Sequence, residues 1–183
     1  MAFNIVTAVQ ERMGFEEFEK IDPNFQQTSE ECPDHYAQAA TIAVLTGLYK
    51  YAQEAGGAAE IADPGSDQLL DHIFKDQKAG IIDAVGSYDH ELADGTQIFM
   101  QKIAQVTVEI LHSEVPPGGK TAENIQSVLA GQRHHILSYL PPDLHMGSAM
   151  NDQSLDDRTN KMEGPVSGLA HFVESVFSQK VIP

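Results

Sequence analysis

The sequence contains no tryptophan, one cysteine and few basic residues. A single cysteine, Cys32, excludes an internal disulfide bond, and the run Glu31-Cys32-Pro33 offers no neighbouring base that would activate its thiol. No apolar run approaches the length that a bilayer requires. Residues 1–13 lack the basic region and the cleavage site of a signal peptide, so the sequence predicts a cytoplasmic protein.

Basic residues are outnumbered by acidic ones, 11 against 27, which gives a formal net charge of −16. Such a chain repels the phosphates of nucleic acids and the surface of anionic membranes. We therefore expect neither nucleic acid nor membrane as a partner. The charge is compatible with a protein partner, either a second copy of the chain in a homo-oligomer or another subunit.

Strand signals are also scarce, because no alternating β-branched segment stands between turn residues. Helical spacing of apolar residues is present almost throughout, and 183 residues suffice for one domain. Expected helices cover residues 3–13, 15–21, 33–55, 69–74, 81–85, 98–111 and 124–140, the last one stopped by Pro141 and Pro142. The sequence thus predicts an all-α fold, a compact helical bundle. The helix at 98–111 is apolar on most of its circumference, which predicts that it is the central, buried one.

The two halves of the predicted core resemble each other at an offset of 61 residues. At this offset Ile42-Ala43 falls on Ile103-Ala104, and Ile21-Asp22 falls on Ile82-Asp83. Repetition at a fixed period indicates repeated supersecondary units. We therefore expect a tandem of two helical trios within a core at 1–146.

Three segments resemble the bacterial "domain of unknown function 937" family, which includes the YidB-like proteins. They are residues 40–61, residues 70–111, and residues 124–144, which read NIQSVLAGQRHHILSYLPPDL. The resemblance extends over about residues 34–144 and departs from the family pattern in having fewer glycines and no Leu-Pro after the first apolar run. It implies an all-helical bundle. It implies no established catalytic residue, so none is carried over to this chain.

The C-terminal part has a different composition. Residues 147–164 are polar and are predicted to form a linker. Residues 165–183 are predicted to form an amphipathic helix whose apolar stripe comprises Val166, Leu169, Val173, Val176 and Phe177. This stripe needs a surface to pack on, either the chain's own core or, as we prefer, a neighbouring subunit.

The residues capable of chemistry do not form a recognisable catalytic set. Glu109 and His112 have the i, i+3 spacing of carboxylate-bridged metal sites, but the sequence holds no second Glu-x-x-His motif. Residues 118–121, Gly-Gly-Lys-Thr, end like a phosphate-binding loop, but Glu114 stands where the motif needs glycine, and Thr121 is better explained as a helix N-cap. We therefore expect no cofactor.

These observations predict a non-enzymatic protein that acts through protein–protein contacts as a self-associating or scaffold-like subunit. The alternative is a metal-binding bundle or metalloenzyme with His and Glu ligands, for which Glu109 and His112 are the candidates. A bundle that binds a ligand in an apolar internal cavity is a third possibility.

Overall fold

Helices make up all of the regular secondary structure in the part of the chain that the structure describes. The computed structural model describes residues 3–21, 35–62, 68–89, 92–115 and 119–155. The elements are α1 (Ile5–Met13), α2 (His35–Ala52), α3 (Gly57–Ala62), α4 (Leu69–Phe74), η1 (Lys75–Gln77), α5 (Lys78–Gly86), α6 (Ala93–Glu114), α7 (Ala122–Leu137), η2 (Pro142–Leu144), α8 (Met146–Ala149) and η3 (Gln153–Leu155). The predicted all-α helical bundle is thereby confirmed. Among these helices none is long and apolar enough to cross a membrane.

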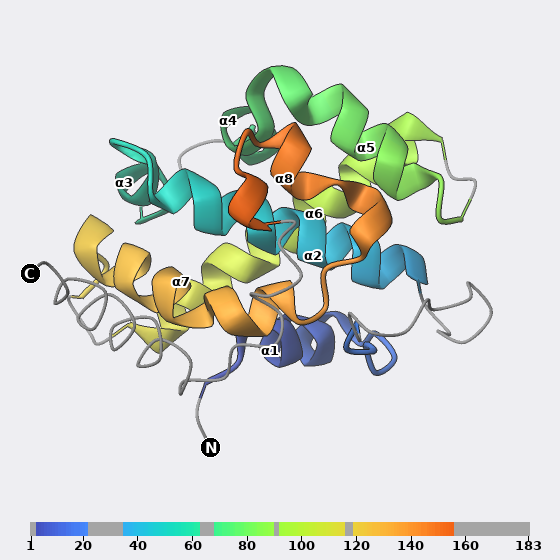
Figure 1. Cartoon of the computed structure of the whole chain (residues 1–183). Helices are drawn as coiled ribbons and strands as arrows, with labels where there is room; N and C mark the ends of the chain where they lie inside the picture. Colours follow the sequence, from blue (N-terminus) through green and yellow to red (C-terminus); the bar gives the residue numbers. More distant parts are fainter. Residues whose placement is uncertain (1–2, 22–34, 63–67, 90–91, 116–118, 156–183) are drawn as a thin grey trace, which may run out of the picture.

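Helix α2 runs through the middle of the bundle, with α4 and α5 above it and α1 and α7 below it in Figure 1. It contacts α1, α3, α4, α5, α6 and α7, and it is buried along nearly its whole length. Small residues make this possible, because alanine, glycine and threonine let neighbouring helices approach closely. At Gly47 an added Cβ would overlap Ile73 and lie 2.5 Å from Phe74 Cε1. Helix α2 is therefore the core helix of the fold.

Helix α6 packs mainly on α1, α2, α4 and α5, with smaller contacts to α3 and α7, and it keeps one side open to solvent. Its buried side carries Met100, Ile103, Ala104, Val108 and Leu111, among others. The prediction that this helix is the central, buried one is therefore wrong. The sequence interpretation counted large apolar residues, whereas burial on all sides depends on small ones.

Helix α1 ends at Gly14, which adopts a left-handed conformation with φ of +72°. The next residues, 15–21, were predicted to be helical, but they form no regular structure. Their backbone groups bond to side chains instead: the amide of the buried Gln38 accepts a hydrogen bond from Glu19 N at 3.0 Å and donates one to Glu19 O at 2.8 Å. These bonds replace the helical ones and place Phe18 in the core.

The expected tandem of two helical trios is consequently incomplete. When the sequence is shifted by 61 residues, α1 aligns with α4 and α2 aligns with α6. These helices therefore recur as the repeat predicts. The middle member does not recur, because α5 is a helix and residues 15–21 are not.

Helix α7 begins at the predicted cap, since Thr121 Oγ1 accepts a hydrogen bond from Asn124 N at 3.3 Å. It ends at Leu137, earlier than expected, and the hydroxyl of Ser138 donates to His134 O at 2.7 Å. The buried side chain of Gln132 holds the start of α1: its Oε1 accepts from Ile5 N at 2.9 Å and its Nε2 donates to Phe3 O at 3.2 Å.

The core continues beyond the boundary predicted at residue 146. Residues 147–155 were assigned to a polar linker, but the structure places part of α8 and all of η3 there. Met146 and Leu155 are fully or almost fully buried at the two ends of this segment. Two apolar side chains thus anchor the ends of an otherwise polar stretch. The remaining linker residues and the predicted helix at 165–183, with Val166, Leu169, Val173, Val176 and Phe177, lie outside the described residues.

Candidate interaction surface

Aromatic side chains gather where the N-terminal half of α6 meets the start of α2. Phe99 stacks on Tyr36 with ring centroids 5.0 Å apart and contacts Phe15 at 5.7 Å. The Tyr36 hydroxyl donates a hydrogen bond to Thr96 Oγ1 at 3.2 Å, which joins the two helices. All three rings are only partly buried, so this aromatic cluster of Phe15, Tyr36 and Phe99 reaches the surface.

Two large apolar side chains beside this cluster are exposed. Leu92, at the N-cap of α6, is 77% exposed, and Ile98, one turn inside the helix, is 72% exposed. At 100° per residue, Leu92 and Phe99 lie on the same side of α6, whereas Ile98 lies about 100° away from Phe99. Ile98 is the first residue of the helix at 98–111 that was predicted to be buried, and its exposure contradicts that prediction.

The sequence held a signal that could have placed Ile98 correctly. Residues four positions apart share a helix face, and the residues at −4 and +4 from Ile98 are Asp94 and Lys102, both charged and both exposed. We call the solvent-facing side of this helix the outer face of α6. It consists of the exposed residues Asp94, Gln97, Ile98, Lys102 and Gln105, together with Gln101, which is partly buried and whose Nε2 is fully buried.

The outer face of α6 carries balanced charge in a strongly acidic chain. Its one acidic and one basic residue, Asp94 and Lys102, form no ion pair with another described residue. Its three glutamines are uncharged. Further along the helix, the charge of Glu109 lies 3.9 Å from the guanidinium of Arg12 on α1. The outer face of α6 therefore adds no net charge to the repulsion between two acidic chains.

The residues proposed as metal ligands contact other groups. Glu109 is 67% exposed and pairs with Arg12, while His112 Nε2 lies 3.2 Å from the backbone oxygen of Ile61 on α3. In the described residues there is no group of three or more His, Cys, Asp or Glu side chains that could hold a metal ion. Glu109 and His112 are thus close in sequence but are not joined by a third ligand in this part of the structure.

Adjacent histidines on α7 do not change this picture. The rings of His134 and His135 lie 6.0 Å apart, centroid to centroid. Burial, followed by the neighbouring charges of His134 and Lys20, lowers the pKa of His135. Both effects favour a neutral ring packed at the end of the helix.

A polar cluster joins the end of α2 to α3 and α4. Glu60 Oε2 accepts a hydrogen bond from the Tyr51 hydroxyl at 2.5 Å and lies 2.6 Å from His72 Nδ1. Burial and the bond to Glu60 raise the pKa of Tyr51 to about 12. The bonds from Tyr51 and then His72 lower the pKa of Glu60. Glu60 is about half exposed, and this arrangement ties three helices together on an open surface.

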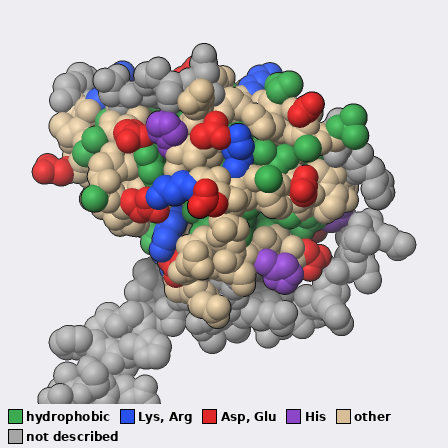
Figure 2. Space-filling model, turned by 90° about the horizontal axis from the view of Figure 1, so that it is seen from above, with side chains coloured by type: hydrophobic (Ala, Val, Ile, Leu, Met, Phe, Trp, Pro, Cys, Tyr) green, Lys and Arg blue, Asp and Glu red, His purple; other side chains and the backbone are tan. Residues whose placement is uncertain are grey.

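Charged residues near this cluster pair with one another. Lys75 pairs with Glu54, and Lys78 on α5 pairs with Asp71 on α4. Figure 2 looks down on the side of the molecule where α4 and α5 lie, and it shows acidic and basic side chains interspersed there. Mutual pairing of this kind satisfies the charges within the chain, in contrast to the outer face of α6.

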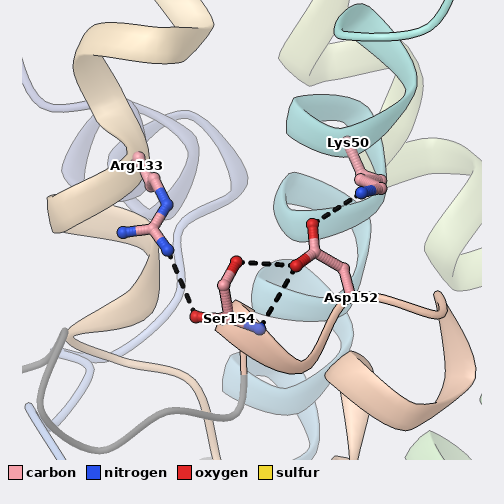
Figure 3. Close-up of polar contacts among 4 residues, drawn as sticks. All are labelled: Lys50, Arg133, Asp152 and Ser154. Atoms are coloured by element: carbon pink, nitrogen blue, oxygen red, sulfur yellow. Dashed lines mark hydrogen bonds and ion pairs between the residues drawn. The ribbon is translucent and has the colours of Figure 1, made fainter.

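The segment at residues 146–155 is held by a second polar network, drawn in Figure 3. Asp152 pairs with Lys50 of α2 at 2.5 Å and accepts a hydrogen bond from the Ser154 hydroxyl at 2.6 Å. Arg133 of α7 donates to Ser154 O at 3.2 Å. The hydrogen bond from Lys50, followed by the one from the Ser154 hydroxyl, lowers the pKa of the Asp152 carboxyl. The network connects α2, α7 and the segment, so its role is to close the core.

A comparison with known proteins finds no matching family model, no matching curated protein and no matching solved structure. The resemblance to the "domain of unknown function 937" family therefore stays a prediction made from the three sequence segments.

Proposed function

We propose that this protein acts through protein–protein contacts, as a self-associating subunit, and that the outer face of α6 with the adjoining aromatic cluster is the contact surface. The observation that carries the proposal is Ile98, which is 72% exposed in the middle of a face that has no net charge. Burying such a side chain is favourable by roughly 1.5–3 kcal/mol. A single exposed isoleucine is common on protein surfaces, so its surroundings decide the argument.

Those surroundings favour a contact between chains. A net charge of −16 makes approach between two copies unfavourable over most of the surface. The outer face of α6 avoids this repulsion because Asp94 and Lys102 balance each other. Beside it lie the partly exposed rings of Phe99, Tyr36 and Phe15. Aromatic residues are enriched in the buried centres of interfaces.

Two predictions from the sequence belong to the same proposal. The stripe at Val166, Leu169, Val173, Val176 and Phe177 offers a second contact with a neighbouring subunit. Membership of the "domain of unknown function 937" family would fit a helical protein without catalytic residues. Both rest on sequence patterns alone, and the contact through the outer face of α6 does not depend on them.

The proposal is tested by sedimentation velocity of the full chain as a function of concentration. We expect the wild-type protein to sediment as an assembly larger than its 20.0 kDa chain at about 100 µM, since association follows mass action. Ile98→Asp should raise the dissociation constant about tenfold or more, because it places a charge in the contact. Ala130→Asp is the matched control, since it adds the same charge at an exposed position of α7.

Circular dichroism of both variants shows whether the fold is intact. A wild-type chain that stays a 20.0 kDa species at every concentration would contradict the proposal. An equal effect of Ile98→Asp and Ala130→Asp would show that association takes place elsewhere.

A further inference from the structure

The charges on the outer face of α6 are arranged symmetrically about Ile98. Asp94 lies four residues before it and Lys102 four residues after it, on the same side of the helix. At 1.5 Å per residue, each charge lies about 6 Å from Ile98 along the helix axis. The three exposed residues thus form a short row with an acidic end, an apolar centre and a basic end.

Such a row is complementary to itself when one copy is reversed. A two-fold axis between the two copies of Ile98 brings these two side chains together. It also places Asp94 of each copy opposite Lys102 of the other, which gives two ion pairs. A contact in which the same patch serves both subunits is the kind that closes a dimer.

We infer that the partner at this surface is a second copy of the chain, with the two α6 helices packed antiparallel across a two-fold axis at Ile98. The inference rests on the proposed function and adds the partner and its orientation. The residues at −4, 0 and +4 form a ridge of the type by which helices pack at 8–10 Å separation. In a parallel arrangement Asp94 would face Asp94 and Lys102 would face Lys102, and the contact would lose its complementarity.

Charge reversal tests the orientation. Asp94→Lys puts lysine opposite Lys102 at both ends of the dimer, and Lys102→Asp puts aspartate opposite Asp94. Each variant alone should have a dissociation constant about tenfold higher than wild type, from two altered ion pairs. An equimolar mixture of the two variants restores both pairs, so a heterodimer should form at wild-type concentrations.

Disulfide trapping tests the position of the axis. In a Cys32→Ser background, Ile98→Cys should form a cross-linked dimer under mild oxidation, because residues on a two-fold axis meet their own copies. Gln105→Cys is the control: the two copies of residue 105 lie about 21 Å apart along the helix axes, beyond the reach of a disulfide. Equal cross-linking at 98 and 105 would overturn the antiparallel arrangement.

The outcomes separate the inference from the proposed function. If Ile98→Asp disrupts the assembly but neither charge variant weakens it and their mixture gains nothing, the surface is a contact and the antiparallel pairing is wrong. If the wild-type chain does not self-associate, both fail. Rescue in the mixture together with cross-linking at 98 and not at 105 supports both.

Discussion

Helices α2 and α6 are the two longest helices of the described residues, and they differ in how much of their surface is buried. Helix α2 is rich in small residues and is buried along nearly its whole length. Helix α6 has more large apolar side chains, yet one of its sides stays open. That side carries amides, Ile98 and two charges that form no ion pair within the described part of the chain. The difference shows that small residues decide which helix can be surrounded. The large apolar residue left outside on α6, Ile98, is the basis of the proposed contact surface.

The largest expected effect is on the free energy of unfolding when one apolar side chain is shortened on α2 or on α6. Leu45 on α2 is completely buried, so Leu45→Ala should lower the free energy of unfolding by about 2–5 kcal/mol. Ile98→Ala should change it by no more than about 0.5 kcal/mol in the monomer, since most of the side chain is in water already. Urea unfolding at low protein concentration measures both. Similar costs at the two positions would show that Ile98 belongs to the core.

A smaller effect tests the role of small residues in α2. Gly47→Ala should destabilise the protein by about 1–3 kcal/mol, because the new methyl group overlaps Ile73 and Phe74. Gly80→Ala on α5 is the control: nothing lies within 4 Å of its Cβ position, and alanine should stabilise the helix by about 0.5–1 kcal/mol. Thermal unfolding of the two variants checks the opposite signs. A neutral Gly47→Ala would mean that α2 is less tightly enclosed than the structure shows.

Glutamines on the two helices should differ in the same way. Gln38 on α2 is 3% exposed and bonds to the backbone of Glu19 and to Tyr139 O. Gln38→Ala should cost about 2 kcal/mol, because it removes three hydrogen bonds and leaves the part-buried backbone groups of Glu19 and Tyr139 without this partner. Gln105→Ala on the outer face of α6 should be close to neutral. Denaturant unfolding measures both variants. An equal loss of stability in the two would contradict the different burial of these glutamines.

The smallest effect concerns the ion pair that holds residues 146–155 to α2. The side chains of Lys50 and Asp152 are 28% and 25% exposed, so the pair should contribute about 0.5–1 kcal/mol. Because the folded-state pKa of Asp152 lies below its unfolded value of about 3.9, this contribution is present above that pH and is lost as the pH falls through the folded pKa.

Asp152→Asn tests the ion pair. The variant should be less stable than wild type at pH 7, and the difference should shrink below about pH 4. Unfolding measured from pH 7 to pH 3 checks this. A difference that stays constant across this range would show that the carboxylate charge is not responsible.

The sequence predicted the helical class and several helix boundaries because these depend on local spacing and capping. Thr121 is an example, since its hydroxyl bonds to a backbone group three residues away. Residues 15–21 could not be predicted, because their backbone partner is Gln38, far along the chain. The docking of residues 147–155 depends in the same way on Lys50 and Arg133. The exposure of Ile98 could have been predicted from Asp94 and Lys102, which share its helix face. The prediction failed because it was based on the number of apolar residues in the whole helix.

The most direct test of the difference between α2 and α6 is hydroxyl-radical footprinting of the wild-type chain at low and high concentration. Raising the concentration from about 1 µM to about 200 µM should reduce the oxidation of Ile98 several-fold, because the dimer covers it. Leu45 should be protected at both concentrations, and Met150, half buried on the segment at residues 146–155, should keep the same rate at both. A constant rate at Ile98 in a sample that self-associates would show that the outer face of α6 stays in water, and the central claim would be wrong.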